Sequence, residues 1–292
     1  MLLTIIYPNT QNYFIKLKIL LVLSYFNNDI LKNQYVKCVR CMKYGNVEIS
    51  PKSWEIIVKT IIESTLGDND MVTNSNIIGH FNLDGLEKIE DVGKYASEKA
   101  MKFISDMTGY SAELKVFNIR LVTPKEIKEE YGDDKKIFTK IDFTGDINGT
   151  GLLIFSEDSA IKLSKAMLLG MGMESDTDEM DDMKISAINE ICNILISAYV
   201  DSFANFMNTA LTMSPPSFIT GSGKELLEKI FNEKNIGDDD IIMAFRSTLH
   251  ICEVGTGFDV LIVLPHDSVK ILFDAINKGD VSDKLSAKYE EQ

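Results

Sequence analysis

Residues 152–163, LLIFSEDSAIKL, and residues 261–272, LIVLPHDSVKIL, share a pattern that decides the fold class. In both stretches an apolar run typical of a strand meets an Asp-Ser pair, and an amphipathic helical pattern follows. We expect the Asp-Ser pair to cap each helix, because its side-chain oxygens can accept the free amides of the first turn. A strand and helix that recur in one chain indicate an internal repeat.

The repeat extends outward from these two stretches. LEKIEDVGKYASEK at 86–99 matches INEICNILISAYVD at 188–201, and strand-like runs such as ELKVFNIRLV, IFTKIDFTGD and IIMAFRSTLHICEV lie between the matched segments. Each half, 81–180 and 181–280, is therefore predicted to contain a helix, strands and a second helix. Two such halves predict an α/β protein with a mixed α+β sheet, helices on one side of it and pseudo-twofold symmetry.

The flanks of the repeat differ from it in composition. We interpret residues 1–80 as an N-terminal extension, with a helix over 52–65, and residues 281–292 as a charged tail. Lysines interrupt the apolar run FIKLKILLVLSYF, which falls short of the about 20 apolar residues of a membrane span and does not resemble a signal peptide. Two interpretations of residues 1–41 stay open: an extra packing helix, or sequence upstream of a start at Met42.

Charge and cysteine content narrow the function classes. The chain of 292 residues has a net charge of −14, which argues against nucleic acid or an anionic membrane surface as a partner. Of four cysteines only Cys38 and Cys41 are close, and no histidine completes a zinc spacing with them. We therefore expect reduced thiols, a cytoplasmic protein and no metal site. The acidic run at 174–182 is expected to be the exposed joint between the halves.

The stretch SAINEICN, residues 186–193, places polar residues in an apolar helical run. Ser186, Glu190 and Asn193 share one helix face, and Ser197 and Asp201 extend the stripe. The opposite side is predicted to be core and consists of Ile188, Cys192, Leu195, Ile196, Tyr199, Phe203 and Phe206. The stripe is therefore either a solvated face or a surface that meets a partner.

The sequence after this helix favours the second interpretation. After Asn193 come 22 residues and then Pro216, which gives S-xxx-E-xx-N-x22-P. This spacing resembles the signature of the CheC, CheX and FliY phosphatase family of bacterial chemotaxis. The segments GDINGTGLLIFSEDSAIKLSKAMLLG and GTGFDVLIVLPHDSVKILFDAI also resemble that family. The resemblance covers about residues 81 to 280, and its two-copy layout is most similar to CheC.

The resemblance implies a function and a role for each residue. The substrate would be the phospho-aspartate of a CheY-like response regulator, whose Mg²⁺ is bound in the regulator itself, so no cofactor of this chain is expected. Asn193 would orient the attacking water, because a carboxamide both donates and accepts hydrogen bonds. Glu190 would pair with a lysine of the regulator, and Ser186 and Pro216 would support the site. A CheD-type deamidase is a further partner that the resemblance leaves open.

The first copy departs from the pattern. Its matching positions are Asp84, Lys88 and Asp91, and Leu114 stands where the second copy has proline. A lysine there would repel the lysine of the partner, and an ionised aspartate cannot donate to water. We interpret this copy as a lost site and predict one active helix per chain. The alternative function is a non-catalytic binding module for a response regulator or a CheD-type protein.

Overall fold

The computed structural model describes residues 43–44, 46–53, 56–57, 83–173, 177–279 and 281. The predictions for residues 1–41, for the pair Cys38 and Cys41, for most of the N-terminal extension 1–80 and for the charged tail after residue 281 therefore lie outside the described residues. Within the helix predicted over 52–65, the described positions 52–53 and 56–57 are helical.

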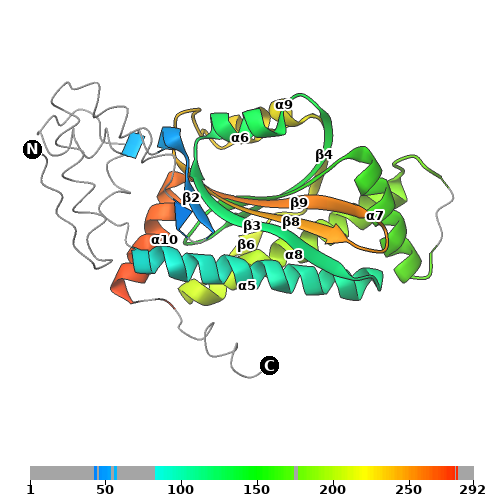
Figure 1. Cartoon of the computed structure of the whole chain (residues 1–292), viewed down its shortest axis with the longest axis horizontal. Coiled ribbons are helices and arrows are strands. Elements are labelled where there is room, and N and C mark those ends of the chain that lie inside the picture. The colour runs from blue at the N-terminus through cyan, green and yellow to red at the C-terminus, as the bar shows by residue number, and fades with distance from the viewer. Residues whose placement is uncertain are drawn as a thin grey trace, which may run out of the picture.

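The two halves contain matching elements in the same order, except that two strands, β6 and β7, stand in the second half where the first has the single strand β3 (Figure 1). The first half contains α5 (Leu83–Thr108), β3 (Ala112–Val122), α6 (Pro124–Tyr131), β4 (Lys135–Thr144), β5 (Gly149–Phe155) and α7 (Glu157–Gly170). The second contains α8 (Asp182–Met207), β6 (Thr212–Met213), β7 (Ser217–Ser222), α9 (Gly223–Glu233), β8 (Ile242–Ile251), β9 (Thr256–Leu264) and α10 (His266–Lys278). Two short strands, β1 (Lys43–Tyr44) and β2 (Val47–Ile49), precede them.

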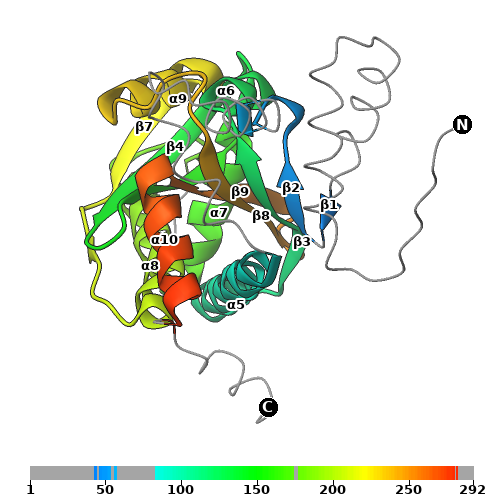
Figure 2. The same ribbon diagram turned by 90° about the vertical axis from the view of Figure 1, so that its left-hand side faces the viewer.

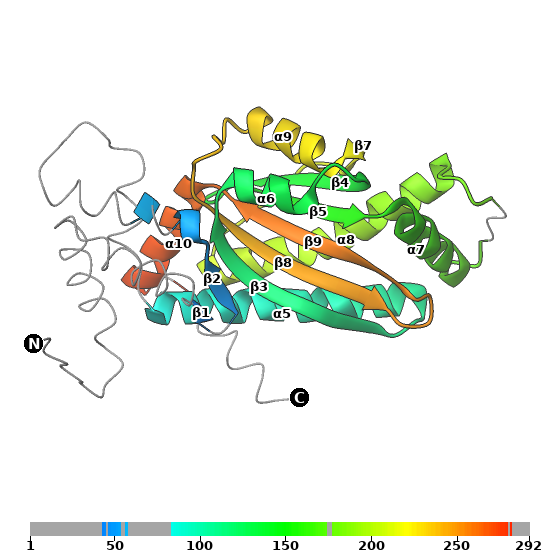
Figure 3. The same ribbon diagram turned by 45° about the horizontal axis from the view of Figure 1, so that its top comes forward.

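All described strands join one nine-stranded sheet in the order β1-β2-β3-β8-β9-β5-β4-β6, and β7 also pairs with β4 (Figure 3). Every pairing is antiparallel except that of β2 with β3, so the sheet is mixed, as predicted. β5 and β9 lie side by side at the centre of the sheet. The first long strand of each half pairs with a strand of the other half: β3 pairs with β8, and β7 pairs with β4. This order is symmetric about the centre of the sheet.

The long helices α5 and α8 meet at matched positions of the two halves. Ser97 and Tyr199 are 102 residues apart, and their hydroxyl oxygens lie 3.0 Å from each other. Ser247 completes this buried cluster, accepting from the Tyr199 hydroxyl at 2.7 Å. Lys99 and Asp201, which also occupy matched positions, form an ion pair at 3.5 Å. Residues near a twofold axis contact their own equivalents, so these contacts confirm the two pseudo-symmetric halves.

Helices cover both faces of the sheet, which corrects the prediction of helices on one side (Figures 1 and 2). The main core lies between one face and the helices α5, α7, α8 and α10. On the other face α6 and α9 pack over a second apolar cluster that includes Phe138, Leu152 and Leu261. Successive residues of a strand point to opposite faces, and the central strands carry apolar residues at both. Such strands require a helix layer on each side.

The helix caps differ from the prediction. Ser156 caps α7 and accepts from the Ser159 amide at 3.1 Å, so the Asp158-Ser159 pair lies inside the first turn. Pro265 occupies the cap position of α10 and makes no side-chain cap bond. Ser268 instead accepts from the Asn148 amide at 2.8 Å and donates to the Asn148 carbonyl at 2.7 Å, which ties α10 to the loop between β4 and β5.

Candidate functional site

The helix α8 carries the predicted site, and both its ends are defined by local chemistry. Asp181 caps the N-terminus by accepting from the Lys184 amide at 2.9 Å. Asn208 ends the helix in the left-handed conformation, with a φ of 52°. The predicted core side of α8 is confirmed, because all seven apolar residues named for it are buried. The polar stripe is exposed at Ser186 and Glu190 and half-buried at Asn193.

A buried lysine fixes the start of α8. The Lys184 ammonium is fully buried and donates to Asp181 Oδ2 at 2.8 Å and to Thr177 Oγ1 at 2.7 Å. The hydrogen bond from the Lys184 ammonium, followed by those from the Lys184 amide and the Thr177 hydroxyl, lowers the pKa of Asp181 to about 2. The described part of the acidic joint is therefore tied to the first turn of the helix that carries the site.

A glycine lets α8 approach the sheet. A Cβ atom at Gly151 of β5 would lie 2.6 Å from Cγ2 of Ile196, closer than real side chains come. On the same side of α8, the Cys192 thiol lies 3.5 Å from the carbonyl oxygen of Thr139 on β4. The close contact with β4 and β5 determines which face of α8 stays uncovered.

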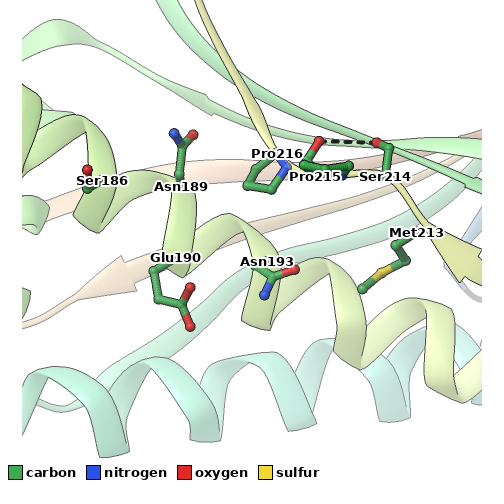
Figure 4. A pocket seen from close by; sticks show the side chains of 8 residues that line it. All are labelled: Ser186, Asn189, Glu190, Asn193, Met213, Ser214, Pro215 and Pro216. Carbon is green, nitrogen blue, oxygen red and sulfur yellow. Dashed lines mark hydrogen bonds between the residues drawn. The ribbon is translucent and has the colours of Figure 1, made fainter.

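The uncovered face of α8 lines an open groove of about 500 Å³ (Figure 4). Its lining residues are Ser186, Asn189, Glu190, Asn193, Met213, Ser214, Pro215 and Pro216. The structure thus brings all four site residues predicted for the second copy to one place. Among the described residues, no side chain forms a hydrogen bond with the Glu190 carboxylate or the Asn193 carboxamide, so both groups are available to a ligand.

The wall opposite α8 is a β-bulge. Met213 pairs with Phe143 and Ser217 with Lys140, so three residues, 214–216, stand opposite two residues of β4. The Ser214 amide donates to the Asp142 carbonyl at 2.8 Å, and the Asp142 amide donates to Ser214 Oγ at 3.0 Å. Proline lacks an amide hydrogen and is tolerated where the ladder is interrupted. The bulge therefore holds Pro215 and Pro216 against the groove.

The Asp142 side chain anchors this wall from the other face of the sheet. It accepts from Thr150 Oγ1 at 2.7 Å and pairs with Lys234 at 3.0 Å and Lys140 at 3.5 Å. Partial burial acts to raise the pKa of Asp142, but the hydrogen bonds and the two positive charges outweigh it and lower the pKa. An ionised Asp142 holds the backbone that positions Ser214.

Sequence reasoning missed four residues of the groove: Asn189, Met213, Ser214 and Pro215. Asn189 carries a usable signal, because it lies one turn before Asn193 on the same face of the helix. Met213 and Ser214 carry none, since their position depends on the register between β4 and β6.

The first copy retains the long helix and the strand interruption of the second copy, but not the side chains that match Glu190 and Asn193. Lys88 is half-buried and Asp91 is exposed on α5, whereas Asp84 lies in α5 with its side chain outside the description. A shift of register in β3 lies between Leu114 and Val116, in the region that matches the bulge at Pro216. Nearby on α5, Glu90 Oε1 accepts from Asn46 Nδ2 at 2.8 Å, so residues that precede the repeat contact this helix.

In the described ranges no three His, Cys, Asp or Glu side chains gather as metal ligands would. None of the described helices is both long enough and apolar enough to cross a membrane.

Comparison with known proteins agrees with this architecture. Residues 137–234 match the family described as chemotaxis phosphatase CheX. The chain is 24% identical over 165 residues to CheC1 of Halobacterium salinarum, whose name proposes a CheY-P phosphatase, and the match covers 56% of this chain and 82% of that protein.

Two solved structures share the fold. FliY of Thermotoga maritima is 18% identical, with a TM-score of 0.52 over 68% of this chain and 98% of that one. FliM of H. pylori, in its complex with SpeE, is 11% identical, with a TM-score of 0.50 over 68% of this chain and 97% of that one. The chain is thus a two-copy α+β protein with a groove beside its second long helix. Part of its sequence is similar to CheX and to CheC1, and it shares its fold with FliY.

Proposed function

We propose that this protein accelerates hydrolysis of the phospho-aspartate of a CheY-like chemotaxis response regulator. One observation carries the proposal: Glu190 and Asn193 lie one turn apart on the exposed face of α8 and line the same groove as Pro216. The name of the CheC1 relative supports the same substrate class.

Hydrolysis of an acyl phosphate requires the protein mainly to position the reacting groups. An acyl phosphate is already activated, and the Mg²⁺ that neutralises its charge is expected in the regulator. The remaining task is to hold a water molecule in line with phosphorus. The Asn193 carboxamide suits this task, because it can accept from the water and donate to a phosphoryl oxygen. Bringing the water and the phosphate into one geometry can lower the barrier by several kcal/mol, on the order of magnitude known for intramolecular reactions.

Glu190 is proposed to set the docking register. Its carboxylate is exposed and can meet an ammonium group of the regulator, which we propose to be an active-site lysine. Ser186 lies one turn earlier and lines the same groove, and Pro216 forms the opposite wall. Since the wall is anchored to β4 through Ser214, the groove is preorganised before the regulator arrives.

A non-catalytic binding module is the second candidate. The first copy favours it, because α5 has Lys88 and Asp91 where α8 has Glu190 and Asn193, so one copy lacks the proposed catalytic pair. In that case the groove would hold a response regulator or a CheD-type protein without hydrolysis.

The test is the decay of a radiolabelled phospho-regulator from the same genome, followed with and without this protein. The proposed function predicts faster release of phosphate with catalytic turnover. A regulator that binds stoichiometrically and decays at its intrinsic rate would instead support the binding module.

A further inference from the structure

Asn189 is the one member of the groove whose polar group is both covered and unpartnered. It lines the groove between Ser186 and Asn193, and Figure 4 shows its carboxamide on the side of the helix that faces Pro216. The Glu190 carboxylate points the other way in the same view. Asn189 and Glu190 therefore place two different polar groups on different sides of the helix, the first covered and the second exposed.

The Asn189 oxygen has no hydrogen-bond partner among the described residues, although it is covered from solvent. Exchange of the amide oxygen and nitrogen would leave a polar atom covered in either orientation. Other polar side chains of α8 do find partners: Ser197 donates to the Asn193 carbonyl at 2.6 Å, and Ser202 donates to the Ala198 carbonyl at 2.5 Å. A covered acceptor without a donor destabilises the free protein.

We propose that Asn189 is a specificity-determining contact, whose carboxamide oxygen accepts a hydrogen bond from an N–H or O–H group of the docked regulator. The proposal rests on the function proposed above. The terminal torsion of an asparagine is soft, so the amide can turn toward the groove when a donor arrives. The unpaired oxygen then forms a hydrogen bond in the complex. Because the free protein lacks this hydrogen bond, forming it makes the free energy of binding more favourable.

This role predicts effects of opposite sign on stability and binding. Asn189→Leu removes the unpaired oxygen and keeps the approximate volume, so the unfolding midpoint of the free protein should not fall and is expected to rise. The affinity for the regulator should drop by about tenfold, the loss typical of one hydrogen bond. Since Asn193 is untouched, KM should rise while kcat is retained. A purely structural asparagine would show a lower unfolding midpoint instead.

The experiment uses the full chain. Urea unfolding is measured without any ligand, and binding is titrated with the regulator activated by beryllofluoride. Asn205→Leu is the matched control, because Asn205 is exposed near the C-terminal end of the same helix and lies outside the groove. Asn189→Asp tests the acceptor itself, since it retains an oxygen and should keep more affinity than Asn189→Leu.

The possible results distinguish a failure of the role of Asn189 from a failure of the proposed function. A lower unfolding midpoint for Asn189→Leu, or an affinity equal to that of the wild type, overturns the role of Asn189 while the proposed function stands. A wild-type protein that neither binds the activated regulator nor speeds its dephosphorylation overturns the proposed function, and the role of Asn189 falls with it.

Discussion

At the scale of single residues, the site combines an amide and a carboxylate one turn apart on a helix. The proposed function gives them different roles: Asn193 would act in the reaction, and Glu190 would act in docking. Substitutions at the two positions should therefore change different measured quantities.

Asn193→Ala should abolish the stimulated dephosphorylation, with a loss of about 100-fold or more in kcat, because the water is no longer positioned. The fold should be retained, since the side chain is half-buried and makes no hydrogen bond with the described residues. Single-turnover decay of the phospho-regulator measures the rate, and circular dichroism checks the fold. An unchanged decay rate would remove Asn193 from the mechanism.

Glu190→Lys should weaken binding of the phospho-regulator by about 2 kcal/mol or more, through repulsion at a desolvated contact. Calorimetric titration measures the affinity. Glu129→Lys makes the same change of charge on α6, on the opposite face of the sheet, and should leave the affinity unchanged. Equal affinities for the two variants would show that Glu190 does not face the partner.

At the scale of elements, the start of α8 depends on an ion pair between its cap and its first turn. The folded pKa of Asp181 is about 2, below the ordinary value of 3.8, so its charge stabilises the folded state above about pH 4. This stabilisation is lost as the pH falls through 2. Asp181→Asn should therefore be less stable than the wild type at neutral pH, and the difference should shrink between pH 4 and pH 2.

Urea unfolding at a series of pH values measures this difference. Asp239→Asn is the control, because Asp239 is exposed and remote from α8 in the sequence. A difference between Asp181→Asn and the wild type that stays constant down to pH 2 would contradict the role of the ion pair.

The helix α5 allows a test of the lost copy. In an Asn193→Ala background, the double change Lys88→Glu and Asp91→Asn should restore a second docking position and part of the activity. Recovery should be partial, because Leu114 replaces the proline although the strand interruption is retained. Titration gives the stoichiometry, and decay of the phospho-regulator gives the rate. Binding at a single position would show that α5 does not present an equivalent face.

At the scale of the whole molecule, the two halves meet at a buried cluster of hydroxyl groups. Tyr199→Phe should destabilise the fold by about 1 kcal/mol, because Ser247 loses a donor and Ser97 loses a partner. Activity should be kept, since Tyr199 is on the core side of α8. Tyr110→Phe is the control, because the Tyr110 hydroxyl makes no hydrogen bond with the described residues. Equal denaturant midpoints for both variants would contradict a structural role for the cluster.

The sequence alone determined the features that repeat locally. The apolar positions of α8 recur at helical spacing and define its buried side, which leaves Ser186, Glu190 and Asn193 on the other. The matched strand and helix segments predicted the two halves and the mixed sheet. The sequence also predicts that the first copy is a lost site, because Lys88 stands where the second copy has Glu190 and reverses the charge. These features depend on neighbours within one or two turns.

Only the tertiary structure decided what faces that helix. Pro216 reaches the groove because β6 and β7 pair with β4 on either side of a bulge, and such register is set by contacts between distant segments. The helices α6 and α9 cover the second face because apolar residues of several strands gather there. The covered oxygen of Asn189 is likewise invisible in the sequence, since the absence of a partner is a property of everything packed around it.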